Sequence, residues 1–125
     1  MSEKPNFSVL IYGVTILSEL NQKWLEESLY HRKLLDEELE MNNILSRVSK
    51  NTPPAFLVHS IDDDVCNVNE SIYYANKLIE NNVFVELHLF SKGGHGFGVG
   101  RVEDGTDQWI PLLVNWLKND FNADY

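Results

Sequence analysis

One histidine and a run of aspartates are the side chains of this sequence best suited to acid–base chemistry. His95 lies among the glycines of 93–98, directly after the apolar run 84–90. Three consecutive aspartates, 62–64, follow a second apolar run, 55–60. An imidazole becomes an effective general base when a carboxylate holds its other ring nitrogen. These two loops could therefore supply the acid and the base of a hydrolase triad.

The elements that must bring these loops together are strands. Short, mostly apolar runs predict strands at 7–14, 55–60 and 84–90. The first two contain almost no polar residue, which is typical of strands buried on both faces of a parallel sheet. Glu86 and His88 make the third run partly polar, so we expect a partly exposed strand.

Helical patterns fill the segments between these runs. Charged residues and recurring leucines over 18–50 predict two or three amphipathic helices, the first capped by Ser18 or by Asn21. These helices should form a long crossover or an excursion such as a cap. Asn67 and Glu70 have the spacing of a capping box, with Glu70 facing outward. Its helix should bury Ile72, Ala75, Leu78 and Ile79. The last helix, 107–121, should bury Trp109, Leu112, Leu113, Trp116 and Leu117.

This alternation of strands and helices predicts an α/β fold with a parallel sheet and right-handed crossovers. In open α/β sheets, active sites lie outside the carboxyl ends of the strands. Asp63 and His95 both follow such ends, on consecutive strands. We therefore expect their side chains to meet.

Composition excludes several classes of function. The chain has 125 residues, enough for one domain, and a formal charge of -9 with only ten Lys and Arg. This charge argues against nucleic acid and against an anionic membrane surface as partners. We expect no metal or cofactor, because the four histidines and Cys66 show no zinc spacing, and 93–100 lacks a Walker lysine. The N-terminus lacks a signal-peptide core, and a single cysteine suits a cytoplasmic protein.

Other candidate residues have simpler interpretations. We expect His59 to be a hydrogen-bonded core or loop histidine, although it could help to shape the site. His88 and His31 should be partly exposed and solvent-facing, respectively. Cys66 follows the acid and lacks an elbow, which disfavours a role as nucleophile. Trp109 and Trp116 are seven residues apart, which is core spacing on a helix.

The sequence resembles a known family over 53–63 (P-P-A-F-L-V-H-S-I-D-D) and over 83–98, which ends in G-G-H-G-F-G. Both stretches are similar to the C-terminal half of α/β-hydrolase esterases, above all to acetyl-xylan-esterase and lipase-like carboxylesterases. The resemblance implies about three parallel strands with crossover helices. It also implies that the triad acid is Asp63, with Asp62 as the adjacent alternative, and that the base is His95.

The same family carries a G-x-S-x-G nucleophile elbow and an HGGG-type oxyanion loop before the strand that begins here at Phe7, and neither motif occurs in this sequence. We therefore expect 1–125 to be the C-terminal portion of an α/β-hydrolase domain without its nucleophile-bearing half, and inactive alone. The resemblance implies a serine hydrolase of small carboxylic esters, with an acetylated sugar as one substrate.

Two alternatives stay open. The first is a fragment of a serine peptidase of the prolyl-oligopeptidase type, which shares this fold and triad order. The second is a non-catalytic, truncated module that associates with itself. A truncated sheet would expose the edge of the strand at 7–14, whose free N–H and C=O groups favour homo-oligomers.

Overall fold

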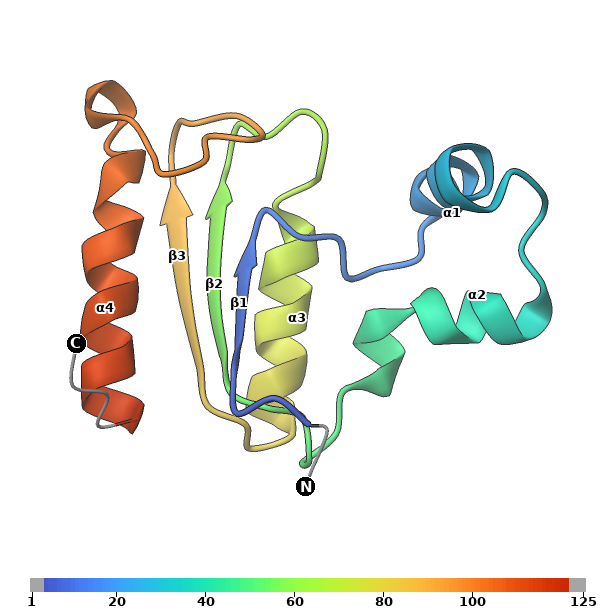
Figure 1. The fold of residues 1–125 in the computed structure, drawn as a ribbon, viewed down its shortest axis with the longest axis horizontal. Coiled ribbons are helices and arrows are strands. Elements are labelled where there is room, and N and C mark those ends of the chain that lie inside the picture. The colour runs from blue at the N-terminus through green and yellow to red at the C-terminus, as the bar shows by residue number, and fades with distance from the viewer. Residues whose placement is uncertain (1–3, 122–125) are drawn as a thin grey trace.

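The computed structural model describes residues 4–121 and contains a parallel three-stranded sheet (Figure 1). The strands are β1 (Ser8–Ile11), β2 (Ala55–Ser60) and β3 (Val85–Phe90), in the spatial order β1-β2-β3. Both pairs are parallel, with helices in the connections. The predicted α/β architecture and its three parallel strands are confirmed.

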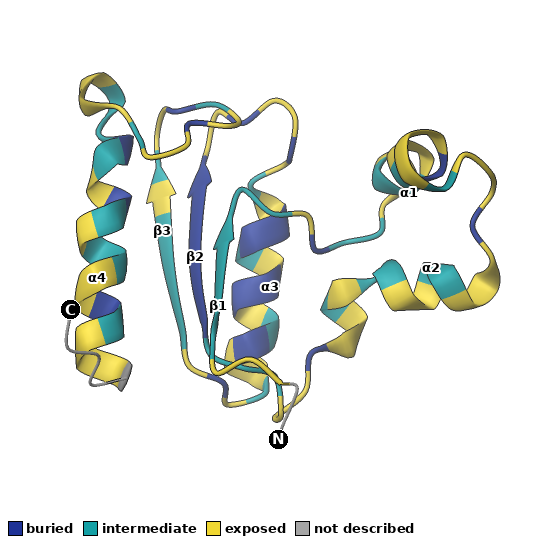
Figure 2. Ribbon diagram, in the orientation of Figure 1, coloured by how far each residue is buried: buried dark blue, intermediate teal, exposed yellow. Residues whose placement is uncertain are grey.

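The core is organised around β2, which is buried along its whole length (Figure 2). Helix α3 (Asn69–Glu80) covers one face of the sheet and α4 (Trp109–Phe121) covers the other (Figure 1). Because side chains of a strand alternate between faces, Leu57 packs in the α3 cluster and Phe56 in the α4 cluster. Full burial of each such side chain contributes about 1.5–3 kcal/mol.

Strand β1 is less buried than its composition predicts. All four of its residues are half-buried, whereas burial on both faces was expected. Its place in the sheet explains the difference, because β1 lies at the edge and, within residues 4–121, only β2 pairs with it. Association of two copies through this edge stays a prediction. Light scattering after gel filtration should give a dimer, and a monomer would contradict it.

The first turn of α3 also differs from the prediction. Asn67 Oδ1 accepts from the amide of Asn69, 2.9 Å away, and no reciprocal capping box forms with Glu70. Glu70 is buried, not outward-facing. Its carboxylate accepts hydrogen bonds from the backbone amides of Thr15 (2.7 Å) and Ile16 (2.6 Å). The Asn67 side chain thus still caps the first amide of the helix, while Glu70 binds two amides of another segment in place of the amide of Asn67.

The buried face of α3 is centred on residues at helical spacing: Ser71, Tyr74, Ala75 and Leu78. Ile79 was expected on this face and is instead 61% exposed. In α4, Trp109 and Trp116 are buried as predicted, and the leucines between and after them are half-buried.

The segment 15–48 extends away from the sheet (Figure 1). It contains α1 (Glu19–Leu25), a π-helical turn (Glu26–Tyr30), α2 (Asp36–Asn42) and a 3₁₀ turn (Ile44–Arg47). Ser18 caps α1 as predicted, accepting from the amide of Asn21 at 3.2 Å.

Two further 3₁₀ turns, Val102–Asp104 and Thr106–Gln108, lead into α4. Across the described residues, none of the helices has the length and apolarity needed to cross a bilayer.

Candidate active site

The ends of β2 and β3 bring the two predicted loops together. Ser60 and Phe90, the last residues of these strands, are register partners. The amide of Ile61 also donates to the carbonyl of Phe90, at 2.8 Å, which extends the pairing by one residue. Both loops therefore leave the sheet side by side, at the edge formed by the carboxyl ends of the strands.

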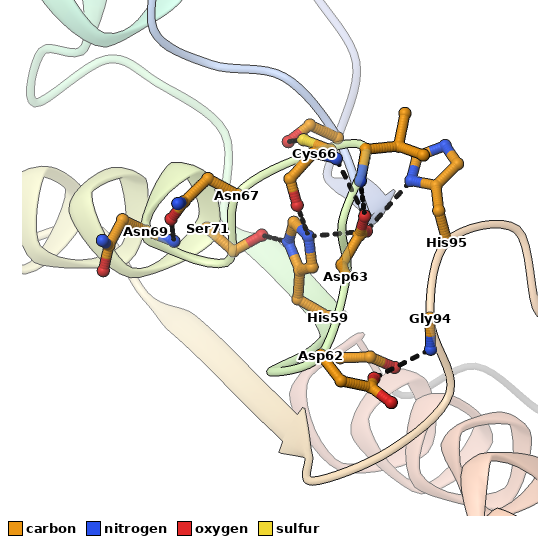
Figure 3. Close-up of polar contacts among 12 residues, drawn as sticks. His59, Asp62, Asp63, Cys66, Asn67, Asn69, Ser71, Gly94 and His95 are labelled. Atoms are coloured by element: carbon orange, nitrogen blue, oxygen red, sulfur yellow. Dashed lines mark hydrogen bonds and ion pairs between the residues drawn. The ribbon is translucent and has the colours of Figure 1, made fainter.

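Asp63 and His95 meet across this edge (Figure 3). His95 Nδ1 lies 2.9 Å from Asp63 Oδ2. The Asp63 side chain is fully buried, whereas that of His95 is 33% exposed. An ionised carboxylate can only accept hydrogen bonds, so Nδ1 carries the hydrogen. In the neutral ring, Nε2 is then the nitrogen that can take up a proton.

The surroundings of Asp63 favour its ionised form. Burial acts to raise its pKa, but the amide of Cys66, the side chain of His95 and the amide of Val65 together lower the pKa below its ordinary value. The two amides reach Oδ1 at 2.8 Å (Cys66) and 2.9 Å (Val65). This carboxylate is therefore charged at neutral pH and can stabilise a protonated His95.

A second histidine also contacts the acid. His59 is completely buried, and its Nε2 lies 3.1 Å from Asp63 Oδ2 and 2.9 Å from the carbonyl oxygen of Cys66. A carbonyl only accepts, so Nε2 carries a hydrogen, and in the neutral ring Nδ1 then accepts from the hydroxyl of Ser71 at 2.7 Å (Figure 3). The single hydrogen on His59 Nε2 is shared between the Cys66 carbonyl and Asp63 Oδ2, so Asp63 accepts three full hydrogen bonds and one shared one.

A hydrogen-bonded histidine was expected at 59, but Asp63 was not expected to be its partner. The position of His59 could have indicated this contact, because His59 is the penultimate residue of a buried strand and lies four residues before Asp63.

Asp62, the adjacent alternative for the acid, makes a different contact. Its Oδ1 accepts from the amide of Gly94 at 2.9 Å. On the other side of the loop, Arg101 Nη2 donates to the carbonyl of Gly93 at 2.7 Å. A Cβ on Gly93 would lie 2.3 Å from Ser60 Oγ, so only glycine fits there. These contacts fix the loop that carries His95.

Tyr12 supports the imidazole from the end of β1. Its ring centroid lies 4.8 Å from that of His95 and 4.9 Å from that of Phe97. Tyr12 has a φ of 45°, in the left-handed region that bulky residues rarely adopt. Such strain costs on the order of 1–3 kcal/mol and is concentrated at functional sites.

Cys66 lies beside the acid without being reactive. Burial, Glu70 and Asp63 raise the pKa of its thiol to about 11. At neutral pH roughly one molecule in ten thousand would carry the thiolate, which is the nucleophilic form. This agrees with the expectation that Cys66 is not a nucleophile.

A cavity of about 410 Å³ opens next to His95, with Tyr12 also in its lining and the α1 residues Leu20, Asn21 and Trp24 opposite them. Among the residues that the structure describes, no three His, Cys, Asp or Glu side chains group to hold a metal ion. The site therefore offers a charged acid, an accessible base and an adjoining cavity, which suits proton transfer in acyl-transfer chemistry.

Comparison with known proteins gives a consistent result. The Prolyl oligopeptidase family matches residues 1–124. An acetylxylan esterase of Xylanibacter ruminicola is 31% identical over 124 residues, covering 93% of this chain and 25% of that protein. The crystal structure of an acetyl ester-xyloside bifunctional hydrolase from Caldicellulosiruptor lactoaceticus superposes with a TM-score of 0.86 at 28% identity, covering 96% of this chain and 44% of that one.

The α/β hydrolase MGS-M1, from a deep-sea metagenome library, superposes with a TM-score of 0.70 at 25% identity, over 95% of this chain and 46% of that one. The chain thus spans about a quarter of the curated relative and less than half of these solved structures.

Proposed function

Because the chain belongs to the prolyl oligopeptidase family, we propose that it supplies the acid and the base of a serine carboxylic-ester hydrolase. Asp63 is the acid and His95 the base of a Ser-His-Asp triad. The observation that carries the proposal is the 2.9 Å contact between Asp63 Oδ2 and His95 Nδ1, which leaves Nε2 as the proton-accepting nitrogen.

The proposed reaction has two proton transfers at Nε2 of His95. The imidazole first takes the proton of a serine hydroxyl while the serine oxygen attacks the ester carbonyl. It then gives that proton to the alcohol oxygen as the carbon–oxygen bond of the ester breaks. A water molecule then attacks the acyl-serine ester, with His95 again taking the proton and returning it to the serine oxygen, and the carboxylic acid product leaves. Asp63 stays ionised throughout and stabilises the imidazolium.

The proposed substrate is an acetylated carbohydrate. The support comes from the relatives, which are named as an acetylxylan esterase and an acetyl ester-xyloside hydrolase. A peptidase activity is the second candidate, because the matched family takes its name from a peptidase.

The test joins this chain to a nucleophile. A chimera would carry these 125 residues in place of the matching part of the Caldicellulosiruptor lactoaceticus hydrolase, and turnover of p-nitrophenyl acetate would be measured. We expect activity that falls by about 10⁴-fold in Asp63→Asn and by about 10⁶-fold in His95→Ala.

Asp62→Asn is the matched control, since it changes a neighbouring carboxylate that does not contact His95, and it should retain most of the activity. The chain alone should be inactive, because its sequence contains no G-x-S-x-G motif. Equal activity in Asp63→Asn and Asp62→Asn would overturn the assignment. Cleavage of a prolyl p-nitroanilide but not of the acetate would favour the peptidase.

A further inference from the structure

The cavity beside His95 has one wall that the reaction itself does not need. His95 and Tyr12 lie on the sheet side, and Leu20, Asn21 and Trp24 come from α1. At about 410 Å³ it is within the usual range of ligand pockets and much larger than an acetyl group requires. A second part of the substrate can therefore occupy it.

The proton transfers decide which part of the ester this is, on the premise of the proposed function. Nδ1 of His95 is held by Asp63, so Nε2 must protonate the leaving alcohol. The alcohol oxygen then lies within hydrogen-bonding distance of Nε2. The acyl carbon lies on the side of the nucleophile. A cavity that starts at His95 therefore receives the alcohol.

The α1 wall of the cavity combines an aromatic ring with a hydrogen-bond acceptor, which is the chemistry of a sugar site. The indole of Trp24 is a flat apolar surface, and this residue is 61% exposed. Asn21 Nδ2 already donates to the carbonyl of Ile16 (2.7 Å) and to Glu70 Oε1 (2.8 Å), so Asn21 Oδ1 is the atom left to accept from a ligand hydroxyl. A pyranose ring offers both an apolar C–H face and hydroxyl donors.

The absence of positive charge in the lining limits the class of ligand further. Among the described residues that line this cavity there is no lysine or arginine, and the chain as a whole carries a formal charge of -9. A phosphorylated or carboxylated sugar would lack a cationic partner there. The ligand class is therefore an uncharged sugar.

The wall is also held in place. Asn21 and Trp24 are three residues apart in α1, which puts them on neighbouring positions of one helix face. The contacts of Glu70 with Thr15, Ile16 and Asn21 fix the start of this helix against α3. A preformed wall lowers the entropy cost of binding.

We infer that the Trp24–Asn21 wall binds the neutral sugar ring of the leaving alcohol, with the indole against the apolar face of the ring and Asn21 Oδ1 accepting from a hydroxyl.

Titration of the 125-residue chain with xylobiose tests this without any catalytic step. Trp109 and Trp116 are buried, so the exposed indole of Trp24 gives a separate reporter in ¹H–¹⁵N spectra. We expect a saturable shift of this indole signal. In Trp24→Ala, binding is measured from the shifts of the backbone amides of α1, and it should be about five- to tenfold weaker. Trp24→Phe should weaken binding by less.

Phe84→Ala is the matched control, because Phe84 is an exposed aromatic outside the cavity, and xylobiose binding should not change. Unchanged binding in Trp24→Ala, or no saturable shift in the unsubstituted chain, would overturn the inference. A larger response to cyclohexanol than to xylobiose would also overturn it, in favour of an apolar alcohol. None of these results bears on ester turnover in the chimera, so the inference and the proposed function can fail separately.

Discussion

The sheet with its two helices and the segment 15–48 are stabilised by different forces. Apolar side chains fill both faces of β2, and α3 and α4 cover them. Much of the segment is exposed (Figure 2), and its exposed residues include large apolar ones: Leu20, Trp24, Leu29, Leu35 and Met41.

The C-terminal end of the segment packs on the α3 cluster through Leu45 and Val48, and carboxylates hold the rest. Glu70 fixes its start, and Glu26 accepts from the Lys33 ammonium at 2.8 Å and from the Leu34 amide at 3.0 Å. Hydrophobic burial is insensitive to pH, whereas contacts of ionised carboxylates are lost when these groups are protonated. Asp63 and His95 therefore lie at the end of the region whose packing is insensitive to pH, and one wall of the adjoining cavity lies in the region that responds to acid.

The largest difference between the regions should appear when a leucine is truncated in each. Leu57 is fully buried in β2, and Leu29 is exposed in the π-helical turn. We expect Leu57→Ala to lower the free energy of unfolding by about 2–5 kcal/mol, because it leaves a cavity. Leu29→Ala should change it by less than about 0.5 kcal/mol. Urea denaturation measures both, and similar losses would contradict the comparison.

The second effect concerns the buried histidine that holds the acid. His59→Phe leaves Asp63 Oδ2, the Cys66 carbonyl and the Ser71 hydroxyl each without one partner. We expect a loss of about 1–3 kcal/mol in unfolding free energy. In the chimera, kcat should fall while KM changes little, because the acid is displaced and the cavity is not.

His59→Gln keeps a donor and should recover part of kcat. A purely structural role for His59 would instead give a loss of folded protein with no change in the kcat of the part that remains folded.

The third effect is confined to the segment. Glu70→Gln removes the charge that accepts from Thr15, Ile16 and Asn21. We expect the free energy of unfolding to fall by about 1–2 kcal/mol. The substitution should also accelerate amide hydrogen exchange more in α1 than in β2. Glu80→Gln, an exposed carboxylate at the other end of α3, is the control. Uniformly faster exchange in both regions would argue against a separate anchoring role for Glu70.

The smallest effect should come from acidification. Hydrogen bonds from Gln22, Lys33 and Leu34 lower the pKa of Glu26 from its ordinary 4.5 to about 2. A carboxylate whose pKa is lower in the folded than in the unfolded state stabilises the fold at any pH above its unfolded pKa. This contribution is lost as the pH falls from the unfolded pKa to the folded pKa. The protection of the amides of 26–34 against hydrogen exchange, relative to their intrinsic exchange rates, should therefore fall between about pH 4.5 and pH 2, and Glu26→Gln should remove that dependence.

The strands and the meeting of the two loops could be predicted from sequence. The apolar run before Asp62 and the glycines around His95 are local patterns, and parallel topology places the ends of such strands at one edge. Glu70 could not be predicted in the same way. Its capping-box spacing is a local pattern, but the amides that it binds come from Thr15 and Ile16, more than fifty residues earlier.

Two smaller errors have the same physical origin. The burial of β1 depends on what lies beyond the edge of the sheet. The burial of Ile79 depends on which face of α3 packs against the sheet. Apolar composition states that a residue can be buried, and only tertiary packing decides whether it is.

His59, Asp63, Ser71 and His95 all belong to one uninterrupted strand–helix–strand stretch that ends in the glycine loop. Their mutual hydrogen bonds need no residue from outside that stretch. A single recombination event could thus transfer this hydrogen-bonded group between genes in one piece, while the residues around it, such as Tyr12 and Arg101, came from the recipient.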